Sequence, residues 1–228
     1  MWLYSTLLFF SILVPFFLSF DKKLQFFKKW KFLFPSILIV AFFYIVFDII
    51  LTNAGVWGFN PMYHFNYLIF GLPIEEWLFF IVIPYASIFL HESLILYFPN
   101  FKLNAYWSRL VTIVAIVCAT IVIGFNIEKA YTVYIYSTLI LTLIFSLLDK
   151  AHVIRRFYAT FLVILIPFIA VNAILTGSFI ESEVVWYNNS ENLNLRFLTI
   201  PIEDFSYAFS LIFLNLLLTE KLKSFFQN

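Results

Sequence analysis

Seven apolar stretches dominate the sequence and constrain its fold more than any other feature. Hydrophobic residues make up 63% of the chain, charged residues only 12%, and the mean hydropathy is +0.96. Soluble domains carry about 45–50% apolar and about 25% charged residues, so an integral membrane protein is expected. The 228 residues allow roughly seven spans of about 20 residues with short loops. The stretches are Trp2–Phe20, Phe32–Leu51, Trp77–Phe98, Ser108–Phe125, Tyr131–Leu148, Phe157–Thr176 and Phe205–Leu218.

Each stretch is predicted to be a transmembrane helix. In hydrocarbon the backbone must hydrogen-bond to itself, and barrel strands would be shorter and would alternate in polarity. The first stretch lacks a basic segment before it and a small-residue cleavage site after it. We therefore expect it to be the first span and not a removed signal peptide. The predicted fold class is all-α integral membrane, with seven transmembrane helices.

The basic residues predict the orientation in the membrane. All Lys and Arg residues except Lys129 and Arg196 fall on one side of a seven-span chain. Positively charged loops stay in the cytoplasm. We therefore expect a multi-pass protein of the cytoplasmic (inner) membrane, with the N-terminus outside and the C-terminus in the cytoplasm. The residues on the cytoplasmic side are Lys22, Lys23, Lys28, Lys29, Lys31, Lys102, Arg109, Lys150, Arg155, Arg156, Lys221 and Lys223.

Several short segments of the first half recur in the second half. "FDIILTNAG" resembles "VNAILTGSF", which aligns Asp48 with Asn172 and Thr52 with Thr176. "LPIEE" is followed 128 positions later by "IPIED", and "YSTLL" near the N-terminus resembles "YSTLI" at Tyr136. The first three spans therefore match the last three.

This internal similarity predicts two parallel three-helix repeats joined by a central helix. Residues 1–107 would form the first repeat, residues 108–126 the linking fourth span, and residues 127–228 the second repeat. A pseudo-two-fold axis along the membrane normal would relate the repeats, as in some transporters. A functional site is then expected at the seam between the halves.

Paired carboxylates begin two of the spans, and these pairs are the strongest candidates for such a site. A proline followed by acids suits the first turn of a helix, which would explain one pair. Two pairs in matched positions, both on the predicted outer side, indicate more than a helix start. A carboxylate at membrane depth is costly and marks a functional site. The pairs are Glu75 with Glu76 and Glu203 with Asp204.

Further polar side chains are expected in the same outer layer. Asp48 and Thr52 are four residues apart and share a helix face, as do Asn172 and Thr176. In a dry environment the ionisation of both adjacent carboxylates is energetically unfavourable, because the two negative charges repel each other. One acid can therefore keep a proton to donate, and an ionised neighbour can accept one. Nearby aromatic faces could stabilise a cation.

The residues of this layer resemble those of a known family. "DIILTNAGVWGFNP", "GLPIEEWLFF", "VNAILTG" and "IPIEDFSY" resemble the membrane-embedded lycopene cyclases of bacteria, archaea and fungi. In bacteria these enzymes occur as two small subunits or as one fused chain, and the family signature is P-x-E-(E/D), once per half. Both copies are present, at Pro73–Glu76 and Pro201–Asp204. The resemblance covers almost the whole chain and looks like the fused, two-repeat form.

The resemblance implies a lycopene β-cyclase of carotenoid biosynthesis, an isomerase of the intramolecular lyase type. The terminal double bond of lycopene is protonated, the neighbouring double bond attacks the cation, and loss of a ring proton leaves a β-ionone ring. Two such events convert lycopene through γ-carotene to β-carotene. The reaction needs an acid, a base and a water-free pocket. We expect no cofactor and no metal, because the chain has no G-x-G-x-x-G motif and its three His residues are scattered.

The same reasoning names the candidate site residues. Glu75 or Glu76, together with Glu203 or Asp204, would supply the acid and the base, with the donor and the acceptor left open. Asp48 would either tune these groups or act as the base. Because Asn172 stands where the first half has Asp48, one shared site is favoured over one site per half. The residues expected to orient the carboxylates near the substrate are Thr52, Asn172 and Thr176.

The expected partners are lycopene taken from the bilayer and the lipid membrane itself, with no nucleic acid. A homo-oligomer or a complex with other carotenoid enzymes is compatible with the resemblance. Two alternatives stay open, a proton-coupled membrane transporter and a cyclase of another, longer-chain carotenoid. A carrier should have polar residues along the cytoplasmic half of its path. The middle and inner parts of the spans are almost wholly apolar, which disfavours a carrier.

Overall fold

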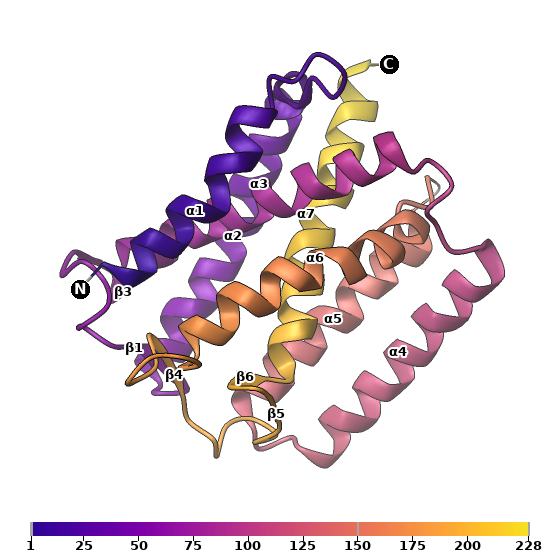
Figure 1. Cartoon of the computed structure of the whole chain (residues 1–228). Helices are drawn as coiled ribbons and strands as arrows, with labels where there is room; N and C mark the ends of the chain where they lie inside the picture. Colours follow the sequence, from indigo (N-terminus) through magenta and orange to yellow (C-terminus); the bar gives the residue numbers. More distant parts are fainter. Residues whose placement is uncertain (1, 150, 228) are drawn as a thin grey trace.

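The computed structural model describes residues 2–149 and 151–227, and this part of the chain is mostly helical (Figure 1). It contains seven α-helices, six of which are long and apolar enough to cross a membrane. Helix α1 is also apolar but has only 16 residues. The six candidate spans indicate a multi-pass membrane protein. The helices are α1 (Leu3–Leu18), α2 (Trp30–Asn53), α3 (Ile74–Tyr97), α4 (Ala105–Phe125), α5 (Ala130–Leu148), α6 (Ile154–Leu175) and α7 (Glu203–Gln227), with a short 3₁₀ helix η1 (Phe26–Lys29) before α2.

Each predicted apolar stretch overlaps one of these helices, and most helices extend beyond it. Helix α3 begins at Ile74, before the predicted Trp77, because Pro73 and the two acids form its start. Helix α7 continues past Leu218 through a polar end. Hydropathy marks only the apolar part of a helix, whereas backbone hydrogen bonding continues through its polar ends. Lys150, one of the cations behind the predicted orientation, lies outside the described residues.

The helices pack as a bundle whose two ends differ. Helix α1 packs against α3, α2 against α3 and α7, α5 against α4 and α7, and α6 against α3. The N-terminus lies beside the short strands at one end of the bundle, and the C-terminus lies at the opposite end (Figure 1). Residues at the start of α3 and at the start of α7 are therefore both found at the end that carries the strands.

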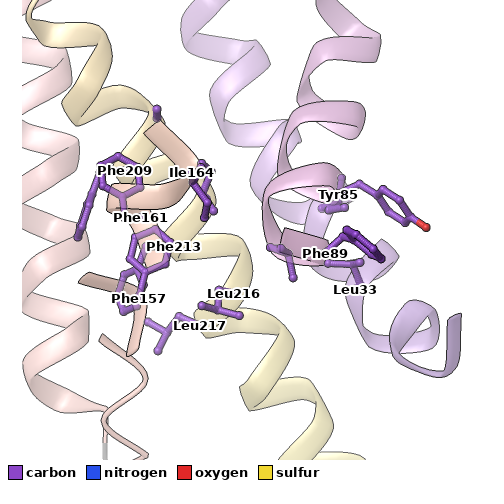
Figure 2. Close-up of a cluster of buried hydrophobic side chains, with 14 of the residues drawn as sticks. Leu33, Tyr85, Phe89, Phe157, Phe161, Ile164, Phe209, Phe213, Leu216 and Leu217 are labelled. Carbon is purple, nitrogen blue, oxygen red and sulfur yellow. The ribbon is translucent and has the colours of Figure 1, made fainter. Parts of the chain in front are cut away.

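A cluster of buried apolar side chains fills the middle of the bundle. Figure 2 shows its aromatic part on α6 and α7. The ring centroids of Phe157 and Phe213 lie 5.1 Å apart, those of Phe157 and Phe209 5.0 Å apart, and Phe213 is fully buried. Truncating a buried Phe to Ala typically costs about 3–5 kcal/mol. This packing fixes α6 against α7 and thereby sets the positions of their ends.

The two long loops contain short strands that an all-helical prediction omits. Within the described loops, β1 (Trp57–Phe59) pairs antiparallel with β4 (Val185–Tyr187) and so joins the loops. Two hairpins, one in each loop, directly precede the acid pairs. Strands of two or three residues leave no periodic pattern, so they could not be predicted from hydrophobic periodicity. The hairpins are formed by β2 (Leu68–Ile69) with β3 (Leu72–Pro73), and by β5 (Arg196–Phe197) with β6 (Ile200–Pro201).

Close packing between the loops depends on a glycine in β1. A Cβ atom at Gly58 would lie 2.4 Å from a ring carbon of Trp186, its neighbour in β4. Any side chain at this position would displace the indole ring. The loops are thus held together as one layer over the acid pairs.

Candidate active site

Both acid pairs lie in the first turn of a helix, as their sequence context predicts. Glu75 and Glu76 follow Pro73 at the start of α3, and Glu203 and Asp204 begin α7. All four carboxylates are buried. Successive residues of a helix point about 100° apart, so the two acids of each pair face different surroundings.

Glu75 fastens the first long loop to the start of α1. Its Oε1 accepts a hydrogen bond from the Ser5 hydroxyl at 2.7 Å and one from the Phe65 backbone N–H at 2.7 Å. Its Oε2 is buried and has no partner among the described residues. This carboxylate therefore holds a loop and a helix end in place.

Glu203 makes the corresponding contacts in the second half. Its Oε1 accepts from the Thr132 hydroxyl at 2.8 Å and from the Leu193 backbone N–H at 2.7 Å. Its Oε2 is likewise buried without a partner in the described part of the chain. The first acid of each pair thus joins the same three elements, namely a loop, a helix start and the helix that follows the hairpin.

The second acid of each pair instead faces the middle of the bundle, where tyrosines meet it. The Tyr4 hydroxyl donates to Glu76 Oε2 at 2.5 Å. The Tyr131 hydroxyl, at the start of α5, donates to Asp204 Oδ1. Tyr4 stands at the start of α1, so both tyrosines come from the first turn of a helix.

Asp204 accepts further hydrogen bonds at its other oxygen. Asn172 Nδ2 and the Tyr187 hydroxyl each donate to Asp204 Oδ2 at 3.0 Å. An ionised carboxylate only accepts hydrogen bonds, so this set of donors suits the ionised form. Burial, and then the neighbouring Asp204, raise the pKa of the Tyr187 hydroxyl well above its usual range. Tyr187, on strand β4, therefore keeps its proton and acts as a donor throughout the physiological pH range.

Asp48, on α2, has fewer donors than Asp204. Its Oδ1 accepts from Trp57 Nε1 at 2.7 Å and, at a longer 3.4 Å, from the Thr52 hydroxyl. Its Oδ2 is buried and has no partner among residues 2–149 and 151–227. A carboxyl group with a free oxygen of this kind has room to carry a proton.

These groups surround one cavity at the strand-bearing end of the bundle. Its volume is about 70 Å³, and its polar lining includes Asp48, Glu76 and Asp204. The other walls are aromatic and aliphatic. They comprise Tyr4, Trp57, Phe59, Phe79, Ile83, Tyr131, Phe168, Leu175, Val185, Tyr187, Tyr207, Ala208 and Leu211, with Asn172 beside Asp204.

A larger apolar groove adjoins this cavity. It has a volume of about 430 Å³, lies between α1, α3 and α6, and opens on the side of the bundle. The two hollows share wall residues, namely Phe79, Ile83, Phe168, Asn172 and Leu175. A long apolar molecule lying in the groove would therefore reach the carboxylates with its end.

One family model accounts for most of the chain. The sequence model described as lycopene cyclase matches residues 1–94 and 128–222, and each segment contains one Pro-x-Glu-acid motif. The chain belongs to the lycopene cyclase family. No curated protein sequence and no solved structure matches it.

The predicted site residues of this lycopene cyclase family member divide into two groups. Asp48, Glu76, Asp204 and Asn172 line one cavity, and Thr52 contacts Asp48. The remaining three lie outside its lining. Glu75 and Glu203 bind the loops, as described above. The Thr176 hydroxyl bonds to the Asn172 carbonyl at 2.8 Å and to Thr199 Oγ1 at 2.8 Å, and thus supports the end of α6.

Sequence reasoning missed the aromatic donors, namely Tyr4, Trp57, Tyr131 and Tyr187. The similarity of "YSTLL" to "YSTLI" pairs Tyr4 with Tyr136. This pairing is wrong, because Tyr136 is not the tyrosine that donates to Asp204. Tyr131 makes the contact to the second acid that Tyr4 makes in the first half. The signal was present, because Tyr131 follows Tyr4 by 127 positions, close to the 128 that separate the acid pairs.

Proposed function

We propose that the protein converts the linear ends of lycopene into β-ionone rings, giving β-carotene by way of γ-carotene, without a cofactor. The observation that carries this proposal is the cavity shared by Asp48, Glu76 and Asp204 beside an apolar groove that opens sideways. A cyclase needs carboxyl groups at the end of a path for a polyene, and this geometry supports that arrangement.

The reaction balances with one proton in and one proton out. A carboxylic acid protonates the terminal double bond and leaves a tertiary cation. The electrons of the neighbouring double bond form the ring carbon–carbon bond, and the positive charge moves to a ring carbon. A carboxylate then removes a ring proton and restores a double bond. General acid and base groups typically contribute 10²–10⁴-fold each, and aromatic faces such as those of Tyr131 and Trp57 stabilise the passing cation.

The hydrogen bonds support a division of roles among the carboxylates. Asp204 accepts from Tyr131, Tyr187 and Asn172, which favours its use as the base. Asp48 and Glu76 line the same cavity, and two carboxyls in a dry space hold a shared proton more readily than two charges. In this proposal that pair supplies the acid.

Glu75 and Glu203 have a positioning role in this account. Each accepts one backbone and one hydroxyl hydrogen bond and lies outside the cavity lining. The first acid of each motif therefore sets the direction in which the second acid points.

We further propose that residues 1–107 and 127–228 are parallel repeats joined by α4, with α1 as the seventh span. Matched contacts support this proposal. Phe65 N–H bonds to Glu75 and Leu193 N–H to Glu203, and Ile74 N–H bonds to Tyr67 as Ile202 N–H bonds to Leu195. The carboxylate end would face outward and the end rich in basic residues would face the cytoplasm, as the positive-inside rule predicts.

Expression in a lycopene-accumulating bacterial host tests the activity. We expect the extracted pigment to shift from lycopene to γ-carotene and β-carotene. Unchanged lycopene, with the protein detected in the membrane fraction, would contradict the proposal. Supplying longer-chain linear carotenoids in parallel tests whether another polyene is the preferred substrate.

A further inference from the structure

A second polar cavity lies at the opposite end of the bundle from the carboxylates. It has a volume of about 510 Å³ and is formed where η1 meets α2, where α3 and α7 approach their ends, and where α6 begins. Glu92, in its wall, follows Glu76 by four and a half turns of α3, which corresponds to about 24 Å. This cavity therefore has no part in the chemistry proposed above.

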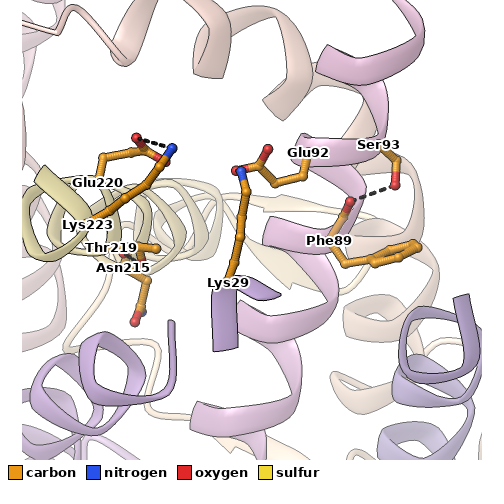
Figure 3. A network of polar contacts seen from close by, with 8 residues as sticks. All are labelled: Lys29, Phe89, Glu92, Ser93, Asn215, Thr219, Glu220 and Lys223. Carbon is orange, nitrogen blue, oxygen red and sulfur yellow. Dashed lines mark hydrogen bonds and ion pairs between the residues drawn. The ribbon is translucent and has the colours of Figure 1, made fainter. Parts of the chain in front are cut away.

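The wall of this cavity carries a surplus of positive charge. Its cations are Lys29, Lys102, Arg155, Arg156 and Lys223, against the carboxylates of Glu92 and Glu220. Lys29 Nζ lies 2.5 Å from Glu92 Oε1, and Lys223 Nζ lies 3.6 Å from Glu220 Oε2. Figure 3 shows both ion pairs, one between η1 and α3 and the other within α7, and all four residues line the same cavity. Each acid is thus already paired with a cation.

The other cations of the wall, namely Lys102, Arg155 and Arg156, form no ion pair among the described residues. Arg155 Nε donates to the Leu103 carbonyl at 3.1 Å, which fixes the guanidinium but leaves its charge uncompensated. The side chains of Lys102 and Arg156 make no hydrogen bond or ion pair within residues 2–149 and 151–227. Three positive charges therefore line one hollow without an ion pair in the described part of the chain, and the two acids of the wall are paired with other cations.

A buried histidine that contacts a neighbouring helix forms part of the inner wall of the cavity. His91, on α3, lines it and is only 2% exposed. Its Nδ1 lies 2.6 Å from Thr160 Oγ1 on α6, so the two helices are fastened together beneath the cavity. Basic residues that merely faced water at the membrane surface would not need to converge on such a recess.

We propose that this cavity binds a phosphate group, and specifically the head group of an anionic phospholipid. Arginine forks match phosphate oxygens in geometry as well as charge. Basic pockets between transmembrane helices, on the cytoplasmic side, are recognised binding sites for anionic lipid head groups. The cavity joins elements from both halves of the chain, so a bound head group would hold α3, α6 and α7 together at this end.

Thermal unfolding of the full chain in detergent tests the proposal. The probes are phosphatidylglycerol, zwitterionic phosphatidylcholine and inorganic phosphate, each added to wild type and to Lys102→Gln/Arg156→Gln. We expect phosphatidylglycerol to raise the melting temperature of wild type more than phosphatidylcholine does. Each cation near an anionic lipid contributes about fivefold in binding, so the double variant should bind roughly 25-fold more weakly. A matched control is Lys28→Gln/Lys31→Gln, which removes two cations outside the cavity wall.

The outcomes separate the sources of the phosphate. A shift with phosphatidylglycerol that is lost in the cavity variant and kept in the control supports the lipid site. An equal shift with inorganic phosphate alone, lost in the same variant, supports the phosphate site but overturns the lipid as its occupant. Equal losses in both variants, or no shift in wild type, overturn the proposal. If the double variant does not fold, Lys102→Gln alone, with an expected fivefold loss, is judged by the same criteria.

Discussion

Replacing Tyr187 with Phe tests the hydrogen-bonded environment of Asp204 at a single atom. The substitution keeps the aromatic ring and removes only the hydroxyl that donates to Asp204 Oδ2 at 3.0 Å. Tyr131 and Asn172 continue to donate to the same carboxylate. The loss therefore isolates one of the three donors that support the proposed role of Asp204 as the base.

The expected magnitude follows from the charge of the acceptor. A hydrogen bond to a charged group contributes about 1.5–3 kcal/mol. Losing this donor disfavours the ionised form of Asp204, so fewer molecules hold the free carboxylate that removes the ring proton, and turnover slows. At 1.4 kcal/mol per factor of ten, the rate should fall by roughly 10- to 150-fold.

The assay is the initial rate of ring formation from lycopene in isolated membranes, normalised to the amount of protein. Tyr67→Phe is the matched control, because Tyr67 lies in the other long loop and its side chain is 63% exposed. We expect the control to retain the wild-type rate. A Tyr187→Phe rate within about twofold of wild type would refute the reasoning. A loss of about 1.5 kcal/mol corresponds to a rate at least about tenfold lower.

Three further predictions concern the roles of other residues. Glu76→Gln should lower the rate of cyclisation by about 10²–10⁴-fold with little change in melting temperature; a near wild-type rate would remove Glu76 from the acid pair. Glu203→Gln should instead destabilise the protein by about 1–3 kcal/mol, because the new amide N–H group would be buried without a hydrogen-bond acceptor. An unchanged melting temperature together with a rate as low as that of Glu76→Gln would make Glu203 a proton-transfer group. Ala170→Trp, in the apolar groove wall, should raise KM for lycopene, whereas Cys118→Trp on exposed α4 should not; equal kinetics in both variants would exclude the groove as the substrate path.

The helices could be predicted because each apolar stretch is long enough to demand internal backbone bonding in a membrane. The layer of acids could be predicted because its motif recurs 128 positions apart. The direction in which each acid points could not be predicted from the sequence. Glu75 and Glu76 are neighbours in sequence, and only the 100° turn between them separates a loop contact from the cavity.

The aromatic donors were harder to predict for a different physical reason. A chain with 13 Tyr and 32 Phe gives no compositional signal for the few rings that meet a carboxylate. Tyr187 reaches Asp204 only because β4 pairs with β1, and that pairing joins loops more than a hundred residues apart. Contacts of this kind depend on the tertiary arrangement and leave no local pattern in the sequence.

Cyclisation of lycopene in heavy water by the purified protein is the most direct test of the central claim. If carboxyl groups that exchange with solvent supply the proton, each ring formed should carry one deuterium, so monocyclic and bicyclic products should gain one and two mass units. Asp48 and Glu76, the proposed acid pair, line the cavity, and a carboxyl proton exchanges with solvent, so no other hydrogen source is required. Ring formation without deuterium would contradict acid–base cyclisation. Recovery of unchanged lycopene from folded protein would contradict the proposed cyclase activity.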